Sequence, residues 1–243
     1  DAKTLSQIST GKKENKFGVS EKDFLELVKY INKSKFVNLK CLSVHIGSQI
    51  LDVKPYENML KALNFLPQPS IAKIQGAAFG GAVGLASCCD IAIASTKASF
   101  CLSEVKLGLI PATISPYVID AIGARAARRL FLTGEIFDAQ KALQLGLVSE
   151  IVDADQLDTA TSSILSTLLQ NGPVALAKSK ALIAKVNSSE RGEELTNYTC
   201  QLIAELRVSE EGQEGLASFL EKRTPEWPLR ANNTNLPTKT CED

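Results

Sequence analysis

The sequence has no net charge to direct it, because 27 basic and 27 acidic side chains cancel over 243 residues. Without an excess of positive charge, a chain lacks the field that draws a protein to nucleic acid or to an anionic membrane. Two short basic runs, 12–16 and 125–129, are interpreted as solvated faces. No apolar run approaches the ~20 residues that cross a bilayer, and no signal peptide opens the sequence. We therefore expect binding to neither nucleic acid nor membrane.

The six cysteines lack the spacing of a zinc site or of a CxxC redox pair. Cys88 and Cys89 are adjacent inside an apolar run, and buried, reduced thiols are the simplest interpretation for the six cysteines. We expect no metal ion and a cytoplasmic protein. The sequence begins at Asp1 rather than Met, so we also expect that an upstream segment is missing.

Apolar periodicity predicts an alternation of strands and helices. The expected elements of the first half are a helix over 20–34, a strand over 39–46, an amphipathic helix in 54–69, strands over 70–75 and 90–95, and a helix that opens at Gly80 and Gly81. The second half is expected to be helical over 115–122, 124–132, 138–145, 155–170, 173–187, 191–208 and 210–222, with a single strand over 147–153 and a disordered tail over 229–243. This order predicts an α/β fold that ends in a helical subdomain.

Two features between residues 71 and 111 carry chemistry. The pair Gly80 and Gly81 stands where a strand turns into a helix, so backbone N–H groups with the positive end of the helix dipole can face a developing oxyanion. The alternative is that these glycines only allow close helix packing. In "FCLSEVKLGLIP", one carboxylate, Glu104, stands among apolar residues, which suits proton transfer. The alternative for Glu104 is a surface carboxylate in a turn.

Four motifs in order, "IAKIQGAAFGGAVGLASCCDIAIAS", "ASFCLSEVKLGLIP", "AARRLFLTGEIFDAQKALQLGLVSEIV" and "EGLASFLEKRTPEW", resemble the enoyl-CoA hydratase/isomerase (crotonase) family over residues 57–228. The branch it most resembles is that of the 3-methylglutaconyl-CoA hydratases. The resemblance implies a crotonase-like spiral core over 57–153, truncated at its N-terminal side, and a helical oligomerisation subdomain over 154–228. It further implies an acyl-CoA substrate, no separate cofactor, and a homotrimer or dimer of trimers.

Carried to this sequence, the resemblance implies that the Gly81 N–H binds the thioester carbonyl and that Glu104 is the acid/base carboxylate. It implies substrate contacts from six further residues, namely Ala78, Phe79, Gly80, Gly84, Leu109 and Pro111. Well-studied hydratases of the family have a second glutamate where this sequence has Gly84. The expected activity is the syn addition of water to an enoyl-CoA such as 3-methylglutaconyl-CoA. A single carboxylate also suits the alternative, a double-bond isomerase.

The first part of the sequence resembles another family. "ISTGKKENKFG" and "HIGSQI", within residues 1–59, are similar to an internal fragment of diaminopimelate decarboxylase, a PLP enzyme with a TIM-like barrel. The resemblance gives His45 a place on the PLP ring and Ser48 a place near its phosphate. The fragment lacks the Schiff-base lysine, the glycine-rich phosphate loop and the acidic partner of the pyridine nitrogen. PLP binding is therefore not expected, and His45 and Ser48 are interpreted as vestigial.

The two resemblances meet inside the helix predicted in 54–69, so we expect a domain boundary near residue 56. The "AGADL"-like loop, which supplies the second oxyanion donor in the hydratase family, does not occur in residues 1–70. Loss of one such donor typically costs about 3 kcal/mol of transition-state stabilisation. The alternative to a weakened enzyme is a non-catalytic fusion product. We also expect that strand 39–46 pairs beside strand 70–75 in place of the lost strands.

Overall fold

A computed structural model describes residues 54–227. The chain forms two compact units, residues 1–62 and residues 63–243. The expected helix 20–34, strand 39–46 with its pairing beside 70–75, and tail 229–243 lie outside the described residues. The amphipathic helix expected in 54–69 is α2 (Lys54–Asn64), which ends before the loop with Pro67 and Pro69, as predicted.

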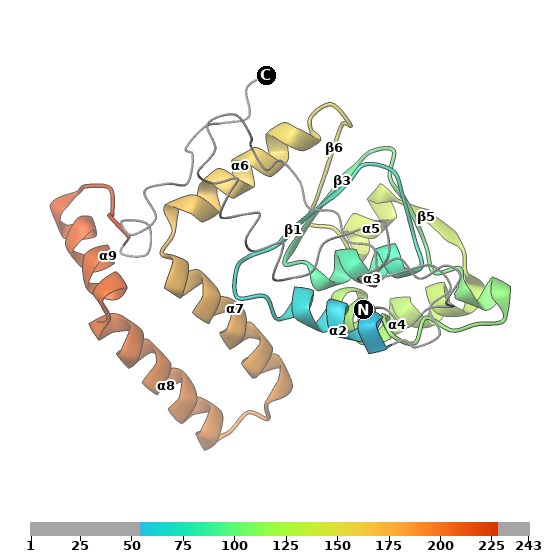
Figure 1. Cartoon of the computed structure of the whole chain (residues 1–243). Helices are drawn as coiled ribbons and strands as arrows, with labels where there is room; N and C mark the ends of the chain where they lie inside the picture. Colours follow the sequence, from blue (N-terminus) through green and yellow to red (C-terminus); the bar gives the residue numbers. More distant parts are fainter. Residues whose placement is uncertain (1–53, 228–243) are drawn as a thin grey trace, which may run out of the picture. The chain divides into compact units, whose positions relative to one another are not determined.

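A parallel sheet of β1 (Ile71–Ile74), β3 (Ile91–Ser95) and β6 (Glu150–Val152) has the order β1-β3-β6 (Figure 1). Ile71 pairs with Ile91, and Ile93 pairs with Glu150. The central strand is the most deeply buried, since four of its five residues are inaccessible to solvent. All three strands were predicted, although β6 is shorter than the range 147–153.

A second sheet consists of β2 (Ala77–Phe79), β4 (Ser99–Cys101) and β5 (Ile136–Asp138). β2 pairs with β4 in parallel, and β5 pairs with β4 in the antiparallel sense. Phe100 and Phe137 stack on the buried face, with 5.5 Å between their ring centroids. This sheet was not predicted from the sequence. The expectation of a single strand after residue 115 is wrong, because strands of three residues are too short to show an alternating pattern.

Four helices surround the sheets: α3 (Gly81–Cys88), α4 (Ser115–Thr133), α5 (Ala139–Leu145) and α6 (Leu157–Gln170). α3 packs on α4, and α6 packs on β1 and β3. The Asp138 carboxylate caps α5 by accepting a hydrogen bond of 2.8 Å from the Lys141 N–H. α4 is broken at Gly123, whose φ of 75° and ψ of 154° are not helical. The two helices predicted on either side of residue 123 are thereby confirmed.

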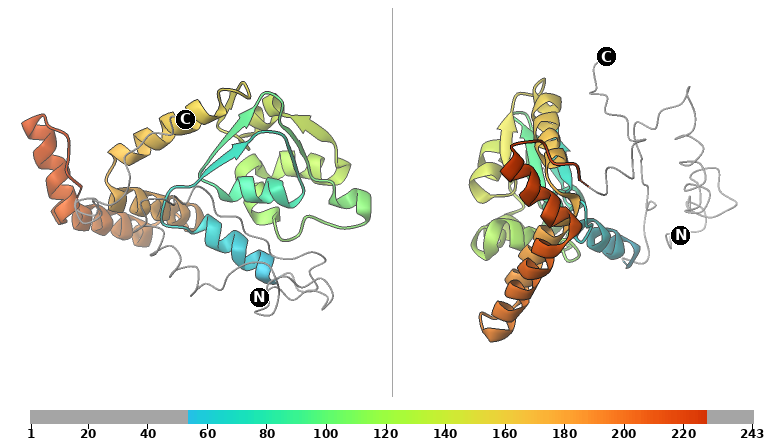
Figure 2. Two further views of the ribbon diagram at one scale, coloured as in Figure 1. Left: turned by 45° about the horizontal axis from the view of Figure 1, so that its top comes forward. Right: turned by 90° about the vertical axis from the view of Figure 1, so that its left-hand side faces the viewer.

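Three further helices follow: α7 (Pro173–Ser188), α8 (Glu193–Val208) and α9 (Glu210–Glu221). α8 packs on α7 and α9, and Figure 2 shows the three helices from two further sides. Glu211, which is 8% exposed, caps α7 from the first turn of α9. Its carboxylate accepts hydrogen bonds of 3.0 Å from the Val174 N–H and 2.7 Å from the Ala175 N–H. Through these hydrogen bonds, the Glu211 carboxylate links the beginning of α7 to the beginning of α9.

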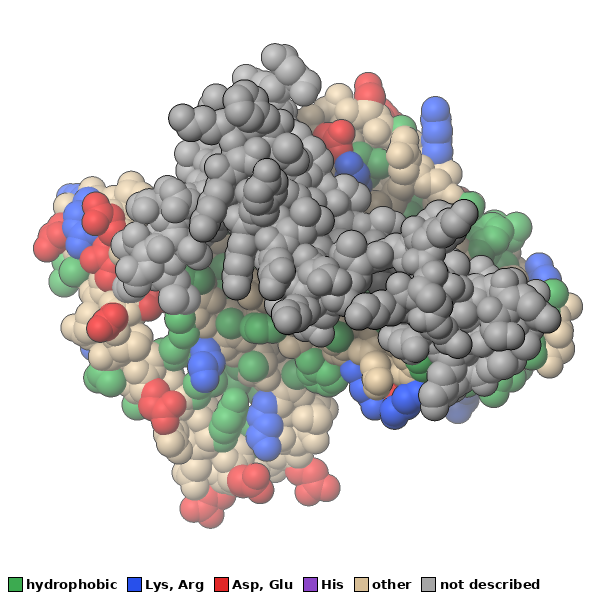
Figure 3. Space-filling model, in the orientation of Figure 1, with side chains coloured by type: hydrophobic (Ala, Val, Ile, Leu, Met, Phe, Trp, Pro, Cys, Tyr) green, Lys and Arg blue, Asp and Glu red, His purple; other side chains and the backbone are tan. Residues whose placement is uncertain are grey.

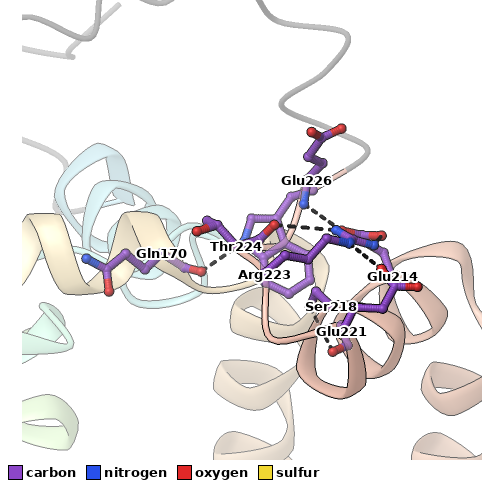
Figure 4. Close-up of polar contacts among 9 residues, drawn as sticks. Gln170, Glu214, Ser218, Glu221, Arg223, Thr224 and Glu226 are labelled. Atoms are coloured by element: carbon purple, nitrogen blue, oxygen red, sulfur yellow. Dashed lines mark hydrogen bonds and ion pairs between the residues drawn. The ribbon is translucent and has the colours of Figure 1, made fainter.

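The segment after α9 folds back as a clasp, defined as residues 223–227 (Figure 4). Two guanidinium nitrogens of Arg223 donate to the Glu214 carboxylate at 2.6 Å and 2.8 Å, and the Glu226 N–H donates to the same carboxylate at 2.6 Å. Trp227 Nε1 donates to the carbonyl oxygen of Gln170 at 2.9 Å. The clasp therefore connects the end of α6 to α9.

The thiols of Cys88 and Cys101 are buried and free, as predicted, and desolvation raises the pKa of Cys88 to about 12. The prediction is wrong for Cys200, whose free thiol is exposed on α8. Cys41 and Cys241 lie outside the described residues. The arginines of the run 125–129 are exposed, which confirms a solvated face. Within residues 54–227, no helix has both the length and the apolar character needed to span a membrane.

We predict that Gly123→Ala destabilises the protein by about 1–3 kcal/mol, because a side chain is strained in the backbone region that Gly123 occupies. A Cβ at Gly123 would meet nothing within 4 Å, so the cost is conformational rather than steric. Gly76→Ala is the control, since a Cβ there also meets no atom and the backbone is not left-handed. Denaturant unfolding measures both variants. Equal stabilities would contradict the prediction.

A second prediction concerns pH. Hydrogen bonds from Arg223 and from the Glu226 N–H lower the pKa of Glu214 from 4.5 to about 2. Because the folded-state pKa is depressed, the clasp stabilises the fold above pH 4.5, and this contribution is lost as the pH falls toward 2. The melting temperature of Glu214→Gln should therefore lie below that of the parent at pH 6, and the difference should shrink through this window.

Glu221→Gln is the matched control for the clasp. Glu221 accepts one hydrogen bond of 2.6 Å from Arg223, and its substitution leaves the bidentate ion pair between Arg223 and Glu214 intact. Its difference from the parent should be smaller at every pH. A Glu214→Gln difference that is constant from pH 6 to pH 2 would count against the role of the ion pair.

Candidate active site

Parallel pairing of β2 and β4 brings the two predicted catalytic features to one edge of the second sheet. Phe79 pairs with Cys101, and the Gly80 N–H extends the pairing by donating to the Cys101 carbonyl oxygen at 2.8 Å. β2 then continues into α3 at Gly81. β4 continues into the 3-10 helix η1 (Glu104–Leu107). The carboxyl ends of parallel strands lie at the same edge, so Gly81 and Glu104 are neighbours in space although 23 positions separate them in the sequence.

Gly80 is a point of close approach between these two segments. Its φ of 53° and ψ of −117° are unfavourable for any residue with a side chain. A Cβ at this position would lie 3.1 Å from Oε1 of Glu104, closer than side chains normally pack. The absence of a side chain therefore lets the Glu104 carboxylate lie directly over the start of α3.

The start of α3 supplies hydrogen-bond donors. The N–H groups of Val83 and Gly84 donate to the Gly80 carbonyl oxygen at 2.9 Å and 3.4 Å. The Gly81 N–H precedes these first helical bonds, so the helix itself provides no acceptor for it. Gly81 is also partly accessible to solvent. This arrangement fits a donor that faces a bound carbonyl oxygen.

Glu104 has an unsatisfied oxygen. Its Oε2 is buried and has no hydrogen-bond partner among the described residues. A buried polar atom without a partner costs free energy, and such atoms are concentrated where a ligand or water completes the bonding. The orphaned oxygen indicates a place where Glu104 receives a partner from outside the described residues.

The loop from residue 104 to residue 114 is apolar and open to solvent near the carboxylate. Leu107, Leu109 and Ile110 are 75%, 60% and 74% exposed. The loop turns at Gly108, whose φ is 70°, and the Leu109 N–H donates to the Glu104 carbonyl oxygen at 3.0 Å. Pro111 is buried. An exposed apolar segment thus follows Glu104 in the chain.

Gly84 lies in α3 beneath the side chain of Ile114. A Cβ at Gly84 would lie 2.6 Å from Cβ of Ile114, so position 84 has no room for a side chain while Ile114 is present. Ile114 is 2% exposed and was not singled out in the sequence, where a single isoleucine carries no distinguishing pattern. The position at which relatives have a second glutamate is therefore closed in this chain.

The structure brings Gly80, Gly81 and Glu104 together and gives the other predicted residues different surroundings. Ala78 is buried and pairs with Phe100 on the core face of the sheet, whereas Phe79 on the opposite face is 42% exposed. His45 and Ser48 lie outside the described residues.

Two surface hollows are found away from Glu104, one of about 560 Å³ between β6 and α6 and one of about 260 Å³ beside the end of α3. Neither is lined by a predicted site residue.

Residues 44–230 match the family profile of enoyl-CoA hydratase/isomerase. This match covers well over half of the chain, and the chain belongs to that family. Residues 1–72 also match the pyridoxal binding domain of the pyridoxal-dependent decarboxylases. Both resemblances seen in the sequence are confirmed, and the two matches overlap over residues 44–72.

Solved structures with the same fold include an enoyl-CoA hydratase from Shewanella pealeana, which is 41% identical at a TM-score of 0.71 and aligns over 85% of this chain and 84% of its own. A protein from Legionella pneumophila, described as an enoyl CoA hydratase/isomerase (crotonase), is 52% identical at a TM-score of 0.69 over 72% of this chain and 68% of its own. The α/β crotonase-like fold with a C-terminal helical region is thereby confirmed.

Among curated relatives, the enoyl-CoA hydratase ACTT6 of Alternaria alternata is 34% identical over 165 residues, which make up 67% of this chain and 55% of that protein. The enoyl-CoA hydratase AKT6-1 of the same organism is 35% identical over 170 residues, or 69% of this chain and 56% of that protein. The chain therefore spans little more than half the length of these two relatives.

Proposed function

We propose that the protein hydrates an enoyl-CoA thioester, with Glu104 as the acid/base and the Gly81 N–H as a donor to the thioester carbonyl oxygen. The observation that carries this proposal is the approach of the Glu104 carboxylate to the start of α3, together with its orphaned Oε2. Substrates named for the family's relatives agree with this chemistry.

In the proposed reaction, the thioester carbonyl oxygen accepts a hydrogen bond from the Gly81 N–H, which stabilises the negative charge that develops there. Glu104 removes a proton from water as the water oxygen bonds to the β-carbon of the double bond. The same carboxylate then returns that proton to the α-carbon. One carboxylate on one side of the substrate adds both parts of water to the same face, which is syn addition.

The substrate side of the site consists of the predicted contacts Phe79, Leu109 and Pro111 and the exposed neighbours of Leu109. An apolar acyl chain would cover Leu107, Leu109 and Ile110, which are otherwise costly to leave in water. A branched enoyl chain such as that of 3-methylglutaconyl-CoA is our candidate. Gly84 has no side chain to offer the substrate, and Ile114 fills the space that such a side chain would occupy.

The second candidate activity is double-bond isomerisation. It needs one group to remove a proton from one carbon and return it to another, and among the described residues Glu104 is the carboxylate that approaches Gly80. A third possibility, a non-catalytic fusion product, follows from the decarboxylase match over residues 1–72 and from the partial coverage of the curated relatives. Assays with 2-enoyl-CoA and 3-enoyl-CoA substrates distinguish all three.

We predict that Glu104→Gln lowers the hydration rate by about 10²–10⁴-fold and leaves the affinity for the enoyl-CoA nearly unchanged, because the carboxylate moves protons rather than docking the substrate. Loss of the enoyl-thioester absorbance measures turnover, and calorimetry measures binding. Glu205→Gln is the control, since Glu205 is an exposed carboxylate on α8, which carries no residue of the proposed site. An unchanged rate in Glu104→Gln would remove Glu104 from the mechanism.

We also propose that residues 154–228 form an oligomerisation subdomain that assembles the chain into trimers or dimers of trimers. The supporting observation is the exposed apolar surface of α7, α8 and α9, where green side chains lie among charged ones in Figure 3. Its most exposed members are Ile183, Ile203, Val208, Phe219 and Leu220. A helix surface of this kind is typical of contacts between subunits.

If the trimer forms through these helices, the double variant Phe219→Asp and Leu220→Asp should lower the mass in light scattering to that of smaller species. Phe219 and Leu220 are 81% and 78% exposed, so the substitutions leave the subunit's own core intact. Leu132→Asp is the matched control, because Leu132 is 77% exposed but lies on α4. A parent protein that is monomeric at all concentrations would refute the assembly.

A further inference from the structure

Ile114 directly precedes α4, and its φ of −92° and ψ of −16° are already helical. No side-chain hydrogen bond from Ile114 caps that helix. The isoleucine is 2% exposed, so its contribution to stability comes from packing.

The packing partner of Ile114 is Gly84. Ile114 Cγ2 and Cβ fill the space in which a side chain at position 84 would lie, so the isoleucine rests directly on the backbone of α3. α3 is the helix whose first residue, Gly81, offers its N–H to the site. Ile114 ends the loop that Glu104 begins. The contact therefore joins the segment of the carboxylate to the segment of the N–H donor.

We infer that Ile114 is a positioning residue that fixes the Glu104 loop against α3 and thereby sets the distance from the carboxylate to the Gly81 N–H. This inference rests on the proposed function for its catalytic consequence. Gly80 provides the close approach on one side of Glu104, and the contact between Ile114 and Gly84 holds the other end of the same loop. A displacement of about 1 Å between catalytic groups costs on the order of 100-fold in rate.

The test is a double-mutant cycle of Ile114→Gly, Gly84→Ala and the two combined. Ile114→Gly removes the contact and should lower kcat by about 10–100-fold with a much smaller change in KM. Gly84→Ala forces the isoleucine away and should lower kcat similarly. In the combined variant, the new methyl group occupies part of the vacated space, with the nearest remaining atom, the Cα of residue 114, at 3.7 Å. Most of the lost kcat should therefore return.

Two controls separate positioning from general loss of stability. Leu130 is 2% exposed near the other end of α4, so Leu130→Ala should lower the melting temperature but not kcat at temperatures where it is folded. Ile114→Val retains a methyl group against Gly84 and should behave as the parent. If Ile114→Gly does not fold, the inference can still be tested with the other variants. It is supported if Ile114→Val has a kcat near the parental value and the combined variant has a restored kcat. Both values should then exceed the kcat of Gly84→Ala.

A readout that needs no turnover is the ¹³C resonance of Glu104 Cδ, assigned with Glu104→Gln. It should move in Gly84→Ala and return in the combined variant. A resonance that stays at its parental position in Ile114→Gly and Gly84→Ala, or a kcat that falls only with the folded fraction as in Leu130→Ala, would overturn the inference. A parent without hydratase activity whose Glu104 resonance follows the cycle would instead refute the proposed function and leave the positioning role intact.

Discussion

The site depends on the parallel pairing of two strands of three residues each. β2 and β4 bring together Gly80 and Glu104, and the hydrogen bond from the Gly80 N–H to the Cys101 carbonyl oxygen continues the pairing to the edge where the chain turns. Every residue type except proline can both donate and accept the backbone hydrogen bonds of a sheet, so the pairing fixes the position of the glycines without specifying their side chains. What makes the edge chemically distinctive is the identity of the residues just beyond it.

Two glycines in this region are required for different reasons. Gly80 needs its freedom of backbone conformation, since its φ is positive, and also the space that admits the Glu104 carboxylate. Gly84 has an ordinary helical place in α3, and only the side chain of Ile114 above it excludes a Cβ. A substitution at Gly80 therefore strains the chain itself. A substitution at Gly84 conflicts with one neighbour and can be compensated there.

Much of the fold could be predicted from the sequence, because long amphipathic helices and buried strands carry periodic patterns. α4 illustrates this well, since the sequence predicts helices over 115–122 and 124–132 and α4 is broken between them at Gly123. The second sheet could not be predicted, because β2, β4 and β5 are each too short for an alternating pattern to show. In the candidate site, Glu104 and the glycine pair were found from their local chemistry. Ile114 was not, since its importance comes from Gly84, which lies 30 positions earlier in the sequence.

In the proposed hydration, the closed position 84 means that one carboxylate would serve both proton transfers of the addition. With two carboxylates, one can remove the proton from water while the other donates to the α-carbon, and neither has to reverse its role. With Glu104 alone, the proton taken from water must be the proton delivered, so the carboxylate is regenerated within a single passage of the substrate. This requires that Glu104 reach both carbons of the double bond without moving its backbone. A loop held at one end by the approach to Gly80 and at the other by Ile114 meets that requirement better than one held at a single point.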